Sequence, residues 1–232
     1  MNIFNIIFAC IIIVGGICGY IPQFYKIVKY KSVENISEPS LLIMNIGMMS
    51  LTMNSMIFNW KYFFSQQINL LPFITIAISW FMVLVYYIIF ITYKIKNLEK
   101  RLISGLNYLF TYIIFALLVI ALALGEKMKH NNNFFTVYAN VLGIFSAIAN
   151  GCVYIPQIYI LLKNKSNGNV SLLMYALQTP GNVINIIFQI IYETPITTWI
   201  TYVICLIQQG IILILMIYFH YKNQKVQEFE EI

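Results

Sequence analysis

The residues best suited to bind a solute lie in the hydrophobic segment 171–191. Its amide side chains recur at steps of four, three and four residues, namely Gln178, Asn182, Asn185 and Gln189. This spacing places all four on one face of a helix. An amide that faces lipid finds no hydrogen-bonding partner, so we expect this face to point into the protein or into a wet cavity.

A further candidate, Asn54, lies in the segment 40–60. When Ser40-Leu41-Leu42 is aligned with Ser171-Leu172-Leu173, which needs a three-residue gap, Asn54 becomes equivalent to Asn185. Hydrogen bonding between helices is worth only about 0.6 to 2 kcal/mol per amide, and for a single asparagine it is as plausible as a binding role. For two repeat-related asparagines near mid-membrane we favour a substrate-lining role.

No acidic side chain and no histidine accompanies these amides inside the hydrophobic segments. The eight acidic residues fall in predicted loops or the tail, the sequence has no aspartate, and His130 and His220 lie in a loop or at a boundary. A proton relay inside a membrane normally needs Asp, Glu or His, and a buried cation needs a counter-charge. Tight proton coupling and a cationic substrate are therefore disfavoured, with Glu193 as the one borderline position.

Enzymatic chemistry is not indicated either. The sequence shows no nucleophile beside a base, no paired carboxylates and no phosphate-binding glycine loop, so we expect no catalytic residue. The four cysteines lie in hydrophobic segments without CxxC spacing, so neither a metal site nor a cofactor is expected.

The composition places these residues in a bilayer. The chain is 60% hydrophobic and 9% charged, whereas a soluble domain would carry about 25% charged residues. A span needs about 20 apolar residues. Seven segments meet this requirement, at about 3–26, 40–60, 69–93, 103–124, 134–161, 171–191 and 196–219.

Basic residues predict the orientation of these spans. Alternate loops carry 11 Lys or Arg on one side and 3 on the other. Cytosolic loops carry the excess of basic residues, so we expect a cytosolic C-terminus and a luminal or extracellular N-terminus. The net charge of +6 is spread over these loops, and no nucleic-acid partner is indicated.

A sequence repeat organises the spans. Tyr20-Ile21-Pro22-Gln23 with Lys31-Ser32 recurs 134 residues later as Tyr154-Ile155-Pro156-Gln157 with Lys165-Ser166. The fold class expected is therefore an all-α membrane protein of seven transmembrane helices, with two parallel three-helix bundles joined by a linker helix (3+1+3). The corresponding boundaries are 1–95 for the first bundle, 96–130 for the linker, 131–221 for the second bundle and 222–232 for a cytosolic tail.

Both motifs carry a proline inside a predicted helix. Proline removes an amide donor and clashes with the carbonyl four residues earlier, so Pro22 and Pro156 should kink their helices, either as hinges or as static bends. Gln23 and Gln157 would hydrogen-bond the freed carbonyls or each other at a gate, or simply contact interfacial water. Tyr20 and Tyr154 precede the prolines by two residues and could close a cavity or stack on a substrate.

These two motifs and the span arrangement resemble the PQ-loop repeat family, a clan that includes cystinosin, lysosomal cationic amino-acid exporters and the SWEET sugar carriers. Gly181-Asn182 is similar to a Gly-Asn element in the amino-acid exporters, whereas Leu51 stands where many of them carry an acid. The resemblance implies hinges for alternating access and a lysosomal or vacuolar membrane. It does not decide whether the protein forms a homo-oligomer.

Together these observations predict a membrane carrier for a small polar solute, with an amino acid favoured over a sugar. The solute would bind at Tyr20, Asn54, Tyr154, Gln178, Asn182 and Asn185, and Pro22, Gln23, Pro156 and Gln157 would form the hinges and gate. A facilitative SWEET-like sugar carrier and a non-transporting receptor or assembly factor are the alternatives.

Overall fold

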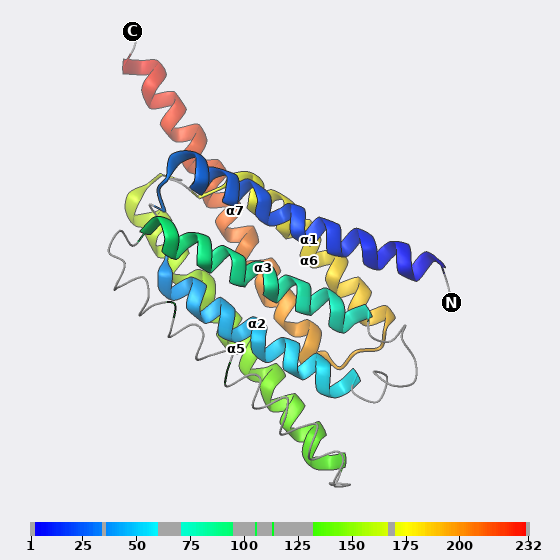
Figure 1. Cartoon of the computed structure of the whole chain (residues 1–232). Helices are drawn as coiled ribbons and strands as arrows, with labels where there is room; N and C mark the ends of the chain where they lie inside the picture. Colours follow the sequence, from blue (N-terminus) through cyan, green and yellow to red (C-terminus); the bar gives the residue numbers. More distant parts are fainter. Residues whose placement is uncertain are drawn as a thin grey trace.

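The computed structural model describes residues 3–33, 36–59, 71–94, 105, 113, 132–166 and 170–230, and six long helices form this part of the chain (Figure 1). They are α1 (Ile3–Tyr30), α2 (Glu38–Asn59), α3 (Leu71–Lys94), α5 (Asn132–Asn164), α6 (Leu172–Ile191) and α7 (Ile196–Glu230). The predicted fourth span, 103–124, lies outside the described residues apart from positions 105 and 113, so the seven-helix arrangement stays a prediction.

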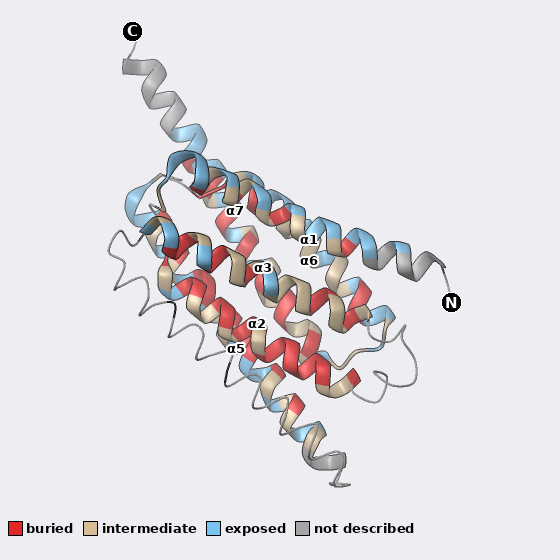
Figure 2. Ribbon diagram, viewed as in Figure 1, coloured by how far each residue is buried: buried red, intermediate tan, exposed pale blue. Residues whose placement is uncertain are grey.

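Five of the six helices are long and apolar enough to cross a membrane: α1, α2, α3, α5 and α7. The sixth, α6, has the 20 residues that a span needs, but its amides lower its mean hydropathy. The outer faces of α1 and α5 are covered by exposed large apolar side chains such as Val14, Ile21, Ile148 and Ile155 (Figure 2). Exposed apolar faces on helices of this length are those of an integral membrane protein.

The helices pack in two related sets of three. In the first set α3 contacts both α1 and α2, and in the second set α7 contacts both α5 and α6. Between the sets, α2 packs along α5 over a long interface, and α1 packs along α6 over a shorter one (Figure 1). The third helix of each set therefore lies between the other two.

Local backbone geometry repeats with the same offset as the sequence motifs. Lys31 and Lys165, which follow α1 and α5, both adopt the left-handed conformation with φ of 48°. Ser37 Oγ accepts a hydrogen bond from the Ser40 amide at 3.3 Å, and Ser171 Oγ accepts one from the Met174 amide at 3.2 Å. Each serine thus caps the N-terminus of the helix that follows.

These caps correct the alignment that the sequence suggested. Ser171 corresponds to the capping Ser37, and Ser40 lies within the first turn of α2. The offset of 134 residues therefore continues into α2 and α6 without the three-residue gap. As a result, Asn185 is equivalent to Leu51 rather than to Asn54, and Asn54 is equivalent to Phe188.

Candidate functional site

A cavity of about 270 Å³ lies between the two sets of helices and is lined by residues of all six described helices. A water molecule occupies about 30 Å³ in the liquid, so this volume corresponds to about nine waters. It is the size of a pocket for a small metabolite rather than for a peptide. Among the described residues that line it, none carries a charge.

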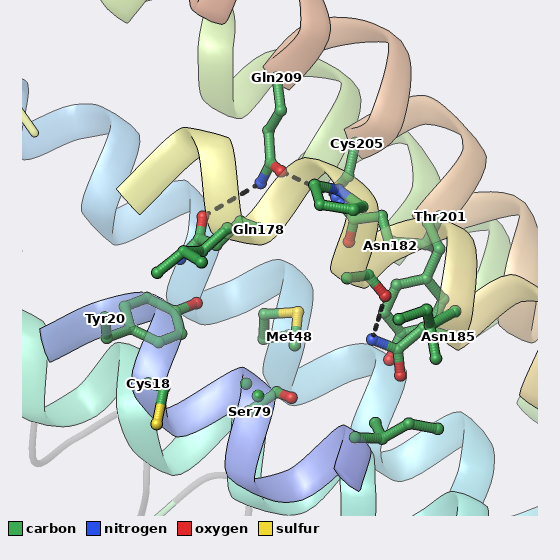
Figure 3. A pocket seen from close by; sticks show the side chains of 18 of the residues that line it. Cys18, Tyr20, Met48, Ser79, Gln178, Asn182, Asn185, Thr201, Cys205 and Gln209 are labelled. Atoms are coloured by element: carbon green, nitrogen blue, oxygen red, sulfur yellow. Dashed lines mark hydrogen bonds between the residues drawn. The ribbon is translucent and has the colours of Figure 1, made fainter. Parts of the chain in front are cut away.

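The side of the cavity formed by α5, α6 and α7 is rich in hydrogen-bonding groups, and we call it the polar wall (Figure 3). Its eight polar residues are Asn150, Tyr154, Gln178, Asn182, Asn185, Thr201, Tyr202 and Gln209.

The opposite side, formed by α1, α2 and α3, consists mainly of apolar and small residues, and we call it the apolar wall. It comprises Ile11, Ile12, Gly15, Gly16, Cys18, Met44 and Met48, together with Tyr20 and Ser79. The Ser79 hydroxyl is already used, since it donates to the Thr75 carbonyl oxygen at 2.9 Å.

A chain of hydrogen bonds orders the amides of the polar wall. Asn182 Nδ2 donates to Gln209 Oε1 at 2.8 Å, and Gln209 Nε2 donates to Gln178 Oε1 at 3.4 Å (Figure 3). Gln209 Nε2 also donates to Tyr154 Oη at 2.6 Å. The NH2 group of Asn182 thus donates to Gln209, and the NH2 group of Gln209 donates in turn to Tyr154 and Gln178. The direction of the chain leaves the NH2 group of Gln178 at its end.

Two polar atoms of this wall lack a partner. Gln178 Nε2 and Thr201 Oγ1 are both buried without a hydrogen bond. An unpaired buried polar group costs about 1–3 kcal/mol. A solute that brought hydrogen-bonding groups to these atoms would recover that free energy.

Five of the six residues predicted to bind solute line this cavity: Tyr20, Tyr154, Gln178, Asn182 and Asn185. They come from α1, α5 and α6, and Asn185 Nδ2 donates to the Gly181 carbonyl oxygen at 3.0 Å. Their function as substrate ligands stays a prediction.

Asn54 does not lie with the other five. It is fully buried, its Nδ2 donates to the Ala139 carbonyl oxygen at 2.7 Å, and its Oδ1 accepts from Thr198 Oγ1 at 2.7 Å. Its amide therefore joins α2 to α5 and α7 outside the cavity. This is the packing role that the sequence left open for a single asparagine.

The two glutamines of the repeated motifs are buried, which excludes simple contact with interfacial water. Gln23 Oε1 accepts a hydrogen bond from the Ser171 amide at 2.8 Å, and nearby Lys26 Nζ donates to the Val170 carbonyl oxygen at 2.9 Å. These contacts connect α1 to the segment that leads into α6. We call this end of the bundle, which carries Gln23 and Gln157, the motif end.

Pro22 and Pro156 lie inside α1 and α5, two residues beyond the tyrosines that line the cavity. The prolines therefore separate the cavity from the motif end. Whether they act as hinges stays a prediction.

At the other end of the cavity α1 meets α6 through apolar contacts. Ile12 of α1 forms a small buried cluster with Phe188 of α6, and Ile184 packs against it. Between α1 and α6, polar contacts thus lie at the motif end and apolar contacts at the opposite end.

The sequence reasoning missed several residues of the polar wall, chiefly Asn150, Thr201 and Gln209. Asn150 lies four residues before Tyr154 and so shares its helix face. Gln209 belongs to an isolated Gln208-Gln209 pair in a span that is otherwise nearly free of amides. Helical spacing would have found Asn150, and Gln209 could have been recognised as an amide in an apolar span, where a polar group must find a partner inside the protein.

The architecture and the cavity define an all-helical integral membrane protein built from an internal repeat. The family model of the PQ loop repeat matches residues 4–64 and 138–198, and the chain belongs to the PQ-loop family. The two matched segments begin and end 134 residues apart, in agreement with the offset given by the helix caps. The family resemblance seen in the sequence is thereby confirmed.

Two further similarities were found. The chain is 24% identical over 265 residues to an uncharacterised protein of Schizosaccharomyces pombe, covering 98% of this chain and 84% of that protein. Its fold is similar to that of a solved eukaryotic SWEET transporter, with a TM-score of 0.61 and 13% identity, covering 94% of this chain and 99% of the other. The protein therefore has the fold of a SWEET transporter.

Proposed function

We propose that the protein is a carrier that moves a small polar solute, an amino acid in preference to a sugar, across its membrane by alternating access. The observation that carries this proposal is the cavity between the two sets of helices, whose described lining residues are all uncharged and whose wall holds two unpaired polar atoms. A cavity reached by both halves of a repeat can be opened to either side when the halves rock against each other.

The movement would occur between residues 1–95 and 131–221, with 96–130 as the linker and 222–232 as the cytosolic tail. Opening toward the motif end requires the contacts of Gln23 with Ser171 and of Lys26 with Val170 to break. Opening at the other end requires the apolar cluster of Ile12 and Phe188 to separate and the hydrogen bonds of Asn54 to α5 and α7 to break or move with α2. Pro22 and Pro156 would act as the hinges.

The charge distribution supports a cytosolic motif end and C-terminus, with the N-terminus luminal or extracellular. Family membership supports a lysosomal or vacuolar membrane. The uncharged side chains that the described part of the chain contributes to the cavity wall favour a solute without net charge, because an unpaired ion in such a site is strongly disfavoured.

Transport by the full chain in liposomes tests the proposal. Vesicles loaded with unlabelled solute should accumulate the labelled form, and a set of neutral amino acids and glucose would be compared. Asn182→Ala, which removes a cavity amide, should slow exchange about tenfold, as expected when roughly one hydrogen bond is lost. Asn140→Ala is the matched control, because Asn140 accepts a hydrogen bond from Thr197 and lies outside the cavity.

Equal exchange rates for the two variants would show that the cavity does not take part in transport. Absence of exchange for every amino acid and sugar, in protein that is correctly folded, would refute the carrier and favour a receptor or assembly factor.

A further inference from the structure

The gapless offset shows that the two walls of the cavity are made by equivalent positions of the repeat. Four pairs of equivalent residues both reach the cavity. One is the identical pair Tyr20 and Tyr154, and in each of the other three the second copy carries an amide where the first does not. These three pairs are Met44 and Gln178, Met48 and Asn182, and Gly16 and Asn150.

At these three equivalent positions, the second copy places amides on the polar wall, and the first copy places apolar or small residues on the apolar wall. Figure 3 shows Met48 across the cavity from the amides of α6 and α7. We infer that the substrate is itself two-faced, a neutral amino acid with an apolar side chain, bound with its charged groups on the polar wall and its side chain against Met44 and Met48. This inference rests on the proposed carrier function.

The polar wall suits the amino and carboxylate groups of such a solute. Gln178 Nε2 is a donor without a partner, and the Thr201 hydroxyl can donate or accept. A carboxylate needs donors and an ammonium needs acceptors, and this wall offers both without a net charge.

The apolar wall suits an aliphatic or thioether side chain. Met44 and Met48 are flexible and polarisable, so they adapt to side chains of different shape. Gly15 and Gly16 have no neighbouring atom within 4 Å of the position that a Cβ would take, which leaves open space on the α1 side.

A sugar fits this arrangement poorly. Its hydroxyl groups surround the ring, so several would face Met44, Met48 and Gly16 without a partner. Each unpaired buried hydroxyl costs about 1–3 kcal/mol. A cationic amino acid such as lysine fits poorly too, because it would bring a second ammonium group to a wall whose described residues include no acid.

The test compares solutes on the purified full-length protein by thermal stabilisation and by exchange in liposomes, with L-leucine, L-methionine, L-serine, L-lysine and D-glucose as probes. A ligand stabilises the folded state by mass action. Leucine and methionine should stabilise the protein at concentrations at least tenfold below those that serine or glucose requires, and only these two should exchange rapidly.

A repeat-swapping variant sharpens the test. Met48→Asn places on the apolar wall the residue that the second copy has at the equivalent position, and Met48→Leu is its apolar control. Met48→Asn should lower the preference for leucine over serine about tenfold or more, within the 10–200-fold range that one apolar contact controls, and Met48→Leu should keep it. Met44→Gln gives an independent version if Met48→Asn does not fold.

The outcomes separate the two proposals. Exchange of glucose, lysine or serine in preference to leucine would overturn the inference while the carrier function stands. An unchanged leucine-to-serine preference in the folded swap variants would also overturn it. If none of the five probes is exchanged, and no other amino acid or sugar is exchanged either, the carrier function itself is refuted.

Discussion

Replacing Gly143 by alanine tests how closely the interface between α5 and α7 is packed. A Cβ at position 143 would lie 2.7 Å from the Thr197 carbonyl oxygen and 2.8 Å from Asn54 Nδ2. The first contact is with backbone, so a helix would have to move, and the second would displace the hydrogen bond from Asn54 to Ala139. Overpacking of this kind costs about 1–3 kcal/mol.

The helical preference of alanine acts in the opposite direction. Alanine is more favourable than glycine within a helix by about 1 kcal/mol. Since the strain falls on the main chain and on a buried amide, we take the upper end of the overpacking cost and expect a net loss of about 2 kcal/mol. For a chain of this size that loss lowers Tm by about 4–8 °C.

Thermal unfolding of the purified protein in detergent measures this effect. The control is Gly151→Ala on the same helix, where the nearest atom to the added Cβ would be Ile204 Cγ2 at an ordinary 3.8 Å. This variant should keep or raise Tm by about 2–4 °C, because only the helical preference acts. If Gly143→Ala melts at or above the temperature of Gly151→Ala, the close packing of α5 against α7 and Asn54 is refuted.

Three further predictions concern the motif end and the helix ends. Gln23→Leu leaves the buried Ser171 amide unpaired and should lower the unfolding free energy by about 1–3 kcal/mol. Gln23→Glu keeps an acceptor and should lower the unfolding free energy by less in the same denaturation assay. Equal losses of stability in the two variants would argue against the hydrogen bond. Lys31→Gly relieves a left-handed backbone conformation and should raise Tm by about 2–8 °C, whereas no gain would show that the conformation is not strained. Pro22→Ala and Pro156→Ala should both slow exchange in liposomes while solute still stabilises the protein, and normal rates for both would exclude the hinges.

Much of the fold could be predicted because its signals are local. The duplicated motifs gave the offset, and apolar runs gave the helices that the structure describes. The amides at 178, 182 and 185 were recognised because α6 is polar on one face only, so the helical period identifies the face that meets the cavity.

The position of Asn54 could not be predicted in the same way. α2 is buried on nearly all sides, so its polar residues show no single preferred face (Figure 2). Two serines, Ser37 and Ser40, offered alternative alignments with Ser171, and only the backbone shows which of them caps the helix. The choice between Ser37 and Ser40 as the cap, and the helix that Asn54 contacts, depend on tertiary packing. The local sequence does not encode that packing.

The helix ends and the cavity walls of this protein have diverged to different degrees. The left-handed lysines and the capping serines recur in both copies with the same geometry, whereas the side chains that line the cavity differ between Met44 and Gln178. The residues that set the helix ends are therefore different from those that line the cavity and would recognise a ligand. A duplicated gene can thus acquire a new specificity by changing a few side chains on one helix, with the scaffold of both copies left as it was.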